Sequence, residues 1–178
     1  MFFSKHKVLI FILGLSVFIA LLVVGVQAQR FGPQTQATVR QLPQQTVVTL
    51  VEQTELISQS LLNEEYQVLN VWASWCGICR AEHHFLNQIA NQGVAVIGLN
   101  YRDARGSALN YLAELGNPYQ SVIFDPSGKL SIDLGVIGTP ETYLVTQEGN
   151  IVYKHSGLLD QQAWDKFFAA YFVGKGES

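Results

Sequence analysis

The sequence predicts an α/β fold in which helices flank a central mixed sheet. Two apolar runs, Val68–Trp72 and Val94–Asn100, have the length and continuity of strands that are buried on both faces. Segments with helical spacing follow these runs. Further along, two alternating runs lie on either side of Gln147–Asn150, which predicts a hairpin. Because strand–helix–strand connections are right-handed, we expect the parallel strands to share one sheet with helices on both faces.

The length and charge of the chain narrow the possible functions. Its 178 residues allow one domain with a substantial core. The net charge of -3 gives no sign of nucleic-acid binding, so we expect no nucleic-acid partner. Two cysteines cannot form a disulfide framework, and packing must therefore stabilise the domain.

The N-terminal segment predicts a contact with a membrane. Residues 8–26 form an apolar run of 19 residues, about the length of a helix that spans a bilayer. Lys5 and Lys7 precede the run and should stay in the cytoplasm, which places the rest of the chain outside. Residues 1–27 are therefore an uncleaved anchor or, because Val26-Gln27-Ala28 resembles a cleavage site, a signal sequence. The run exceeds the roughly 7–15 apolar residues of a usual signal sequence, which favours the anchor. Either alternative puts the cysteines in an oxidising compartment.

The next segment predicts a tether and the start of the folded domain. Residues 28–46 are rich in Gln and Thr and offer little to bury, so we expect them to connect the membrane segment to the domain. The domain is expected over 47–178, with a first strand that begins at Val47. Glu55–Leu62 is predicted as a short helix with Thr54 as its N-cap.

The remaining elements follow from the spacing of apolar residues and from turn residues. Asp160 is expected to cap the last helix. In order, the predicted elements are the strand Val68–Trp72, a helix over Ala81–Asn91, the strand Val94–Asn100, a helix over Ser107–Leu115, a strand over Val122–Phe124, a helical turn over Leu130–Leu134, the hairpin strands Thr142–Val145 and Ile151–Lys154, and a final helix over Asp160–Phe172.

The two cysteines, Cys76 and Cys79, lie between a predicted strand and the helix that follows it. Unpaired backbone N–H groups and the positive end of the helix dipole favour a thiolate at this place. Cys76 is then the attacking sulfur, and Cys79, one turn further, can displace a mixed disulfide. Two plain buried cysteines and half of a zinc site are the alternatives. A structural zinc site needs four ligands, however, and the sequence has no second Cys-x-x-Cys.

A soft metal site is a further alternative. His83 lies four residues after Cys79 on one helix face, and thiolate and imidazole ligands both suit copper. We favour the simpler interpretation that His83 and His84 are solvent-exposed helix residues. We therefore expect no metal and no cofactor.

Several stretches carry a resemblance to a known family. They are Leu69-Asn70-Val71-Trp72-Ala73-Ser74-Trp75-Cys76, Cys79-Arg80-Ala81-Glu82-His83, Tyr101-Arg102-Asp103, Leu115-Gly116-Asn117-Pro118-Tyr119, and Asp133-Leu134-Gly135-Val136-Ile137-Gly138-Thr139-Pro140-Glu141-Thr142. With these stretches the chain resembles the thioredoxin superfamily. It is similar, more narrowly, to the membrane-anchored thiol:disulfide interchange proteins of cytochrome c biogenesis, the DsbE/CcmG type. The resemblance covers about Val47 to the C-terminus, and its Gly-Val-x-Gly-x-Pro-Glu-Thr run is the most specific part.

The resemblance implies a thioredoxin-like fold and a redox-active disulfide, Cys76–Cys79. It implies a reductant of the heme-binding Cys-x-x-Cys-His site of apocytochrome c, acting directly or through heme-ligation assembly proteins. A membrane electron donor of the DsbD or CcdA type would re-reduce it. The chain would cross the bacterial inner membrane once, through residues 8–26, with the domain on the periplasmic side. The alternatives are a copper-binding chaperone that uses Cys76 and Cys79, and a general disulfide oxidoreductase of the same fold.

The resemblance also points to supporting residues. Ordinary thioredoxins have a proton-transferring aspartate where this chain has Asn70, so the proton role is expected to pass to Glu82 and Glu141. The Thr139–Pro140 peptide is expected to be cis and to lie against the disulfide, where the Thr139 backbone can pair with an extended client. Trp75 is expected to be an exposed platform for the partner chain.

Overall fold

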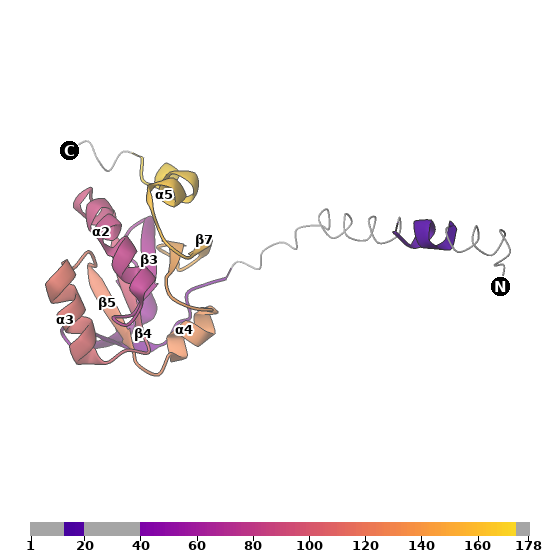
Figure 1. Ribbon diagram of the computed structural model, residues 1–178. Coiled ribbons are helices and arrows are strands. Elements are labelled where there is room, and N and C mark those ends of the chain that lie inside the picture. The colour runs from indigo at the N-terminus through magenta and orange to yellow at the C-terminus, as the bar shows by residue number, and fades with distance from the viewer. Residues whose placement is uncertain (1–12, 20–39, 174–178) are drawn as a thin grey trace. The chain divides into compact units, whose positions relative to one another are not determined.

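A computed structural model describes residues 13–19 and 40–173 of the chain (Figure 1). Residues 13–19 are helical. The rest of the expected anchor over 1–27, and most of the expected tether, lie outside the described residues. Within the described ranges, no helix has both the length and the apolar character that a membrane crossing needs.

The domain consists of seven strands, four α-helices and two short 3-10 helices over the described residues. In chain order they are β1 (Thr46–Thr49), β2 (Glu55–Ile57), η1 (Ser58–Leu61), β3 (Tyr66–Trp72), α2 (Gly77–Asn91), β4 (Val96–Tyr101), α3 (Arg105–Leu115), β5 (Ser121–Asp125), α4 (Lys129–Leu134), β6 (Glu141–Thr146), β7 (Ile151–Ser156), α5 (Gln161–Phe167) and η2 (Ala169–Tyr171).

The strands form one mixed sheet in the order β2-β1-β5-β4-β3-β6-β7. The three central strands, β3, β4 and β5, are parallel. β1 and β6 pair antiparallel with β5 and β3, and β6 and β7 form the predicted hairpin. The carboxyl ends of the parallel strands meet at one edge of the sheet, where ligand sites of α/β folds are found. β3 ends there at Trp72, four residues before Cys76.

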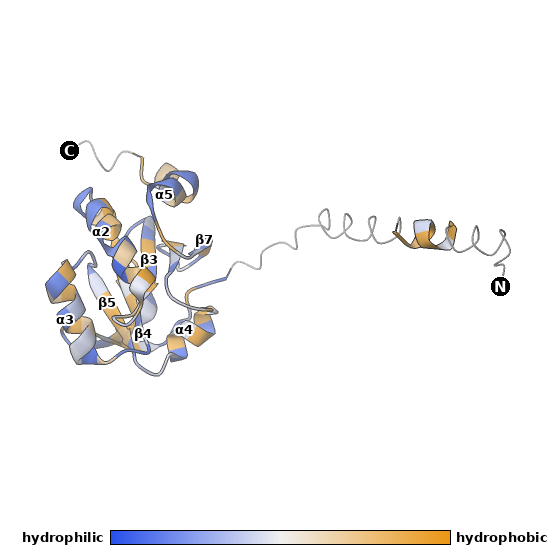
Figure 2. Cartoon of the chain, in the orientation of Figure 1, coloured by the Kyte–Doolittle hydropathy of each residue, from blue (hydrophilic) through white to orange (hydrophobic). Residues whose placement is uncertain are grey.

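The alternation of side chains along β3 separates two apolar cores. Val68 and Trp72 point to the face covered by α2, α3 and α5. Leu69 and Val71 point to the opposite face, which is covered by α4 and residues next to η1. Asn70 lies between Leu69 and Val71, so its side chain points to the α2 face. Figure 2 shows that hydrophobic residues run along the central strands, while α2 carries both hydrophilic and hydrophobic residues.

Most of the predicted elements are confirmed. The strands, the hairpin and the helices after β3, β4 and β5 lie in the predicted order and places, except that α2 begins at Gly77 and not at Ala81. Asp160 caps α5, since its carboxylate accepts a hydrogen bond of 2.8 Å from the backbone N–H of Ala163. The last predicted helix is too long, because α5 ends at Phe167 and a 3-10 turn follows.

The predicted helix over Glu55–Leu62 is wrong. Glu55–Ile57 forms β2, which pairs antiparallel with β1, and a 3-10 helix follows it. Pairing with β1 satisfies the backbone groups of this segment through tertiary contacts that a helical pattern does not reveal.

The folded part of the chain begins before the expected boundary at 47. The backbone N–H of Leu42 donates to the carbonyl of Gly149, and that of Ile151 donates to the carbonyl of Arg40, both at 2.8 Å. Leu42 is also buried, in the core on the α4 face. Residues from Arg40 onward therefore pack with the domain although the sequence analysis assigns 28–46 to the tether.

Candidate active site

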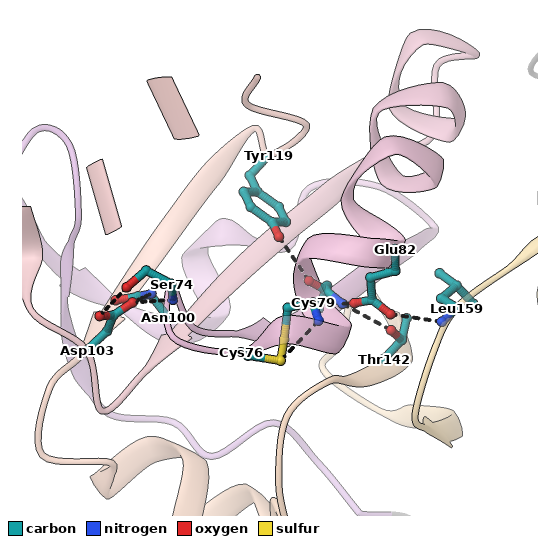
Figure 3. Close-up of a disulfide and its surroundings, with 10 residues drawn as sticks. Ser74, Cys76, Cys79, Glu82, Asn100, Asp103, Tyr119, Thr142 and Leu159 are labelled. Carbon is teal, nitrogen blue, oxygen red and sulfur yellow. Dashed lines mark hydrogen bonds between the residues drawn. A yellow bond between two sulfur atoms is a disulfide. The ribbon is translucent and has the colours of Figure 1, made fainter. Parts of the chain in front are cut away.

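The two cysteines form a disulfide at the N-terminus of α2. Their sulfurs are 2.09 Å apart, and the Cα atoms are 5.3 Å apart. Cys76 is the N-cap residue, and its Sγ accepts a hydrogen bond of 3.0 Å from the backbone N–H of Cys79 (Figure 3). Cys76 is 6% exposed and Cys79 is 1% exposed. The N–H donor and the helix dipole both stabilise negative charge on the Cys76 sulfur after reduction.

A carboxylate fixes the loop that leads into Cys76. Asp103 accepts hydrogen bonds from the backbone N–H of Ser74 at 2.6 Å and from its hydroxyl at 2.7 Å (Figure 3). Asn100, at the end of β4, donates to the same carboxylate at 3.0 Å. The indole N–H of Trp75 donates to the carbonyl of Arg102 at 3.1 Å. The loop after β4 therefore holds the residues before Cys76, and it leaves Trp75 59% exposed.

An apolar groove borders the Cys-x-x-Cys segment at Ile78. It has a volume of about 260 Å³ and is lined by Ile78, Ile137, Gly138, Thr139, Pro140, Glu141, Ser156 and Gly157. Thr139–Pro140 is a cis peptide, as the resemblance implies. Ile78, between the two cysteines, is 52% exposed, and Ile137 is 91% exposed. The groove thus brings Thr139 and Pro140 beside the Cys-x-x-Cys segment and offers an apolar surface next to it.

A buried polar network lies on the α2 face of the sheet. Glu82, fully buried on α2, accepts hydrogen bonds from the side-chain amide of Asn70 at 2.9 Å and from the backbone N–H of Leu159 at 2.8 Å. The Asn70 amide also donates to the hydroxyl of Thr142 at 3.2 Å. Tyr119 donates its hydroxyl proton to Asn70 Oδ1 at 2.9 Å. In Figure 3, Glu82 points from α2 toward Thr142 and Leu159.

Burial is the main cause of the raised pKa of Glu82. Removal from water raises the pKa of Glu82 to about 7, and the hydrogen bonds from Leu159 and Asn70 limit the rise. A carboxyl group with this pKa exchanges a proton readily near neutral pH. Burial likewise raises the pKa of Tyr119 well above its ordinary value, so its hydroxyl keeps its proton.

The second predicted carboxylate, Glu141, lies in a different place. It pairs in register with Val71, which points to the α4 face, whereas Asn70 and Glu82 lie on the α2 face. Its carboxylate accepts hydrogen bonds from the hydroxyl of Tyr143 at 2.7 Å and from the backbone N–H of Ile137 at 3.1 Å. Lys154 Nζ is 3.0 Å away. The sheet therefore separates the two carboxylates, and Glu141 supports the groove segment that contains Ile137.

The expectation that His83 is solvent-exposed is wrong, whereas His84 is exposed as expected. His83 is 2% exposed, and its Nε2 is 2.8 Å from the carbonyl oxygen of Gly116. Burial lowers the pKa of His83, which favours the neutral ring. Over residues 13–19 and 40–173, no three His, Cys, Asp or Glu side chains gather closely enough to hold a metal ion.

The structure gives site roles that the sequence does not predict: Asp103 fixes the loop before Cys76, and Tyr119 and the Leu159 backbone join the network around Glu82. Asp103 and Tyr119 belong to quoted motifs, Tyr101-Arg102-Asp103 and Leu115-Gly116-Asn117-Pro118-Tyr119, which gave the only signal. The backbone N–H of Leu159 has no sequence signal, because only the fold brings this loop to Glu82.

The fold and the site together define a class. A disulfide that caps a helix after a central parallel strand, beside a cis Thr-Pro segment, is the arrangement of a thioredoxin-like dithiol–disulfide protein. The redoxin family profile matches residues 37–166. The structure of a putative thiol:disulfide interchange protein DsbE from Chlorobium tepidum aligns with a TM-score of 0.60 at 24% identity, covering 71% of this chain and 89% of that one. This alignment supports the fold.

Sequence relatives give the narrower assignment. The thiol:disulfide interchange protein DsbE of Vibrio cholerae is 44% identical over 131 residues, which cover 74% of this chain and 71% of the relative. The DsbE of Haemophilus influenzae is 39% identical over 165 residues, which cover 90% of this chain and 91% of the relative. The chain therefore belongs to the redoxin family and, within it, to the DsbE-type thiol:disulfide interchange proteins.

Proposed function

We propose that this thiol:disulfide interchange protein reduces the heme-binding Cys-x-x-Cys-His disulfide of apocytochrome c, and that Cys76 and Cys79 carry the reaction. The observation that supports this most directly is the helix-capping disulfide, together with an apolar, solvent-open groove that Ile78, between the two cysteines, helps to line. An extended client chain would lie in this groove, pair with the Thr139 backbone beside Pro140, and contact Trp75. The cytochrome client rests on the resemblance to the cytochrome c biogenesis branch.

The proposed reaction has two exchange steps. The Cys76 thiolate attacks one client sulfur, a mixed disulfide forms, and the second client sulfur leaves as a thiolate that takes up a proton. Cys79 then gives its proton to the Glu82 carboxylate and attacks Cys76 Sγ. The mixed disulfide breaks, the released client thiolate takes up the proton that Glu82 gives back, the client leaves with two thiols, and Cys76–Cys79 is oxidised. Two electrons pass to the client, and a dithiol membrane donor of the DsbD or CcdA type restores them.

The two carboxylates have different proposed roles. Glu82 lies one turn after Cys79, and its pKa of about 7 suits a group that accepts and returns a proton. Glu141 accepts hydrogen bonds from Tyr143 and from the Ile137 backbone, so we assign it to the shape of the groove.

The proposed location is the periplasmic side of the bacterial inner membrane. We propose that residues 8–26 span the membrane once and that the chain up to Arg40 connects the span to the domain. Support comes from the apolar run and from Lys5 and Lys7 ahead of it.

A trapping experiment tests the proposed function. In Cys79→Ser, the resolving thiol is absent, so cells that make c-type cytochromes should accumulate a mixed disulfide between Cys76 and apocytochrome c or an assembly protein. Cys76→Ser should trap neither and should lose cytochrome assembly. Capture of many unrelated exported proteins would instead favour a general disulfide oxidoreductase. Unimpaired cytochrome assembly in Cys76→Ser cells would contradict the proposal.

A further inference from the structure

The side chain of Tyr119 is buried and is held by contacts with neighbouring rings. It is 6% exposed. Its ring stacks on Trp72 with ring centroids 5.6 Å apart, and it meets His83 edge-on at 6.1 Å. Gly98 provides the space, because a Cβ there would lie 3.0 Å from Tyr119 Cγ. Packing on all these sides fixes the position of the Tyr119 hydroxyl.

The Tyr119 hydroxyl contacts the oxygen side of the Asn70 side-chain amide. Tyr119 donates to Asn70 Oδ1 at 2.9 Å, so Oδ1 faces Tyr119 and Nδ2 faces the other way. Nδ2 then donates to Glu82 at 2.9 Å and to Thr142 at 3.2 Å. All four groups are buried, and an ionised Glu82 can only accept, so Nδ2 must be the donor on that side.

The opposite orientation of the amide would change what Glu82 meets. A side-chain amide can turn over so that its oxygen and nitrogen exchange places. Asn70 Oδ1 would then face the Glu82 carboxylate. The Tyr119 hydroxyl could accept from Nδ2, but its own proton would have lost the Oδ1 acceptor. An oxygen facing a carboxylate disfavours the ionised form and favours the protonated acid.

We infer that Tyr119 is a positioning residue of this site, whose hydroxyl holds the Asn70 amide in the orientation that presents a donor to Glu82. The inference deepens the proposed function and rests on it where it concerns the exchange reaction. Tyr119 has only an indirect proposed effect on the sulfurs. It acts through Asn70 on the proton affinity of Glu82.

Few other groups around Glu82 can change the pKa of its carboxyl group. Asn70 from β3 and the Leu159 backbone from the loop before α5 donate to it. Tyr119 and Tyr111 are the titratable groups that sense its charge, and Cys79 precedes it on α2. Neither ion pair in the described part of the chain, Arg80–Glu114 or Lys154–Glu141, includes Glu82.

A titration of Glu82 tests the inference. The oxidised full-length protein is labelled with ¹³C at the glutamate carboxyl groups, and Glu82→Gln identifies the Glu82 signal. In Tyr119→Phe the midpoint of this signal should rise by about one pH unit, the size expected when a carboxylate loses one hydrogen bond. The pH profile for reduction of a disulfide peptide by the reduced protein should shift in the same direction.

Tyr111→Phe is the matched control. Tyr111 is also buried against Trp72 and His83, but its hydroxyl has no hydrogen-bond partner in the described part of the chain. This variant loses the same atom and should leave the Glu82 midpoint unchanged. In an Asn70→Ala background, Tyr119→Phe should no longer move it.

The possible outcomes separate the two proposals. An unmoved Glu82 midpoint in Tyr119→Phe, or an equal shift in Tyr111→Phe, overturns the positioning role. A shifted midpoint supports that role whatever the exchange assay gives. If the midpoint moves while the pH profile of peptide reduction does not, the proton role assigned to Glu82 in the proposed function fails.

Discussion

Replacing Glu82 by Gln should remove a large pH dependence of stability. The pKa of Glu82 is about 7 in the folded, oxidised protein, against an ordinary value of 4.5 that applies when the chain unfolds. Each pKa unit corresponds to about 1.4 kcal/mol, so the full difference in unfolding free energy is about 3 kcal/mol.

The sign follows from which state binds the proton. Below about pH 4.5 the carboxyl group is protonated in both states, and above about pH 7 it is ionised in both. Between these values the folded state keeps a proton that the unfolded state has released. The unfolding free energy therefore falls as pH rises through this window. His83 acts in the opposite sense, because burial lowers its pKa and protonation at low pH opposes folding.

Urea unfolding of the oxidised protein at pH 5 and pH 8, followed by tryptophan fluorescence, measures the effect. Most of the Glu82 contribution, about 2–3 kcal/mol, should be lost between these two pH values in the wild type. Glu82→Gln should not show this loss, whatever its absolute stability. Comparing the two proteins at both pH values cancels the contribution of His83.

Glu148→Gln serves as the control. Glu148 is exposed, and the hydrogen bond from the Thr146 hydroxyl lowers its pKa, so it stays ionised from pH 5 to pH 8. This variant should keep the wild-type pH dependence. If Glu82→Gln and the wild type lose equal stability over this range, the Glu82 carboxyl group does not keep its proton in the folded state.

Three further substitutions test the packing around the site by urea unfolding at constant pH. Gly98→Ala places a Cβ 2.9 Å from Trp72 Nε1 and should lower the unfolding free energy by about 1–3 kcal/mol, whereas Gly106→Ala, with open space at its Cβ, should not destabilise. Asp103→Ala removes the acceptor for Ser74 and should cost about 1–3 kcal/mol; an unchanged urea midpoint contradicts its anchoring role. Leu42→Ala should cost about 2–5 kcal/mol because Leu42 is 2% exposed, and a loss under 1 kcal/mol would show that the segment before β1 contributes little.

Continuous apolar runs predict the central strands well because both faces of β3 and β4 are buried. The place of the Cys-x-x-Cys pair after a strand is equally predictable, but α2 begins at Gly77 and includes Cys79, whereas the sequence predicts a helix only from Ala81. In contrast, Glu55–Ile57 is a strand only because β1 lies beside it, and no local spacing encodes that partner.

The burial of polar residues is the feature of the site that the sequence does not predict. Glu82 and His83 follow one another on α2 and have the composition of a solvated helix face. They are buried because α3, the Gly116 turn and the Leu159 loop close over them, and each finds a backbone group at 2.8 Å. The separation of Glu141 from Glu82 likewise depends on strand register, which places neighbouring residues on opposite faces of the sheet.

The short pairing between Arg40–Leu42 and the start of β7 affects how readily the domain associates with other chains through its sheet edge. β7 is the last strand of the sheet, and an uncovered edge strand invites another chain to add to it. The Ile151 amide is already bound to Arg40, and Gln41 bridges to Asn150. The segment that leads into the domain thus covers part of its own sheet edge, and a fragment cut back to residue 47 should self-associate more readily than one that keeps Arg40.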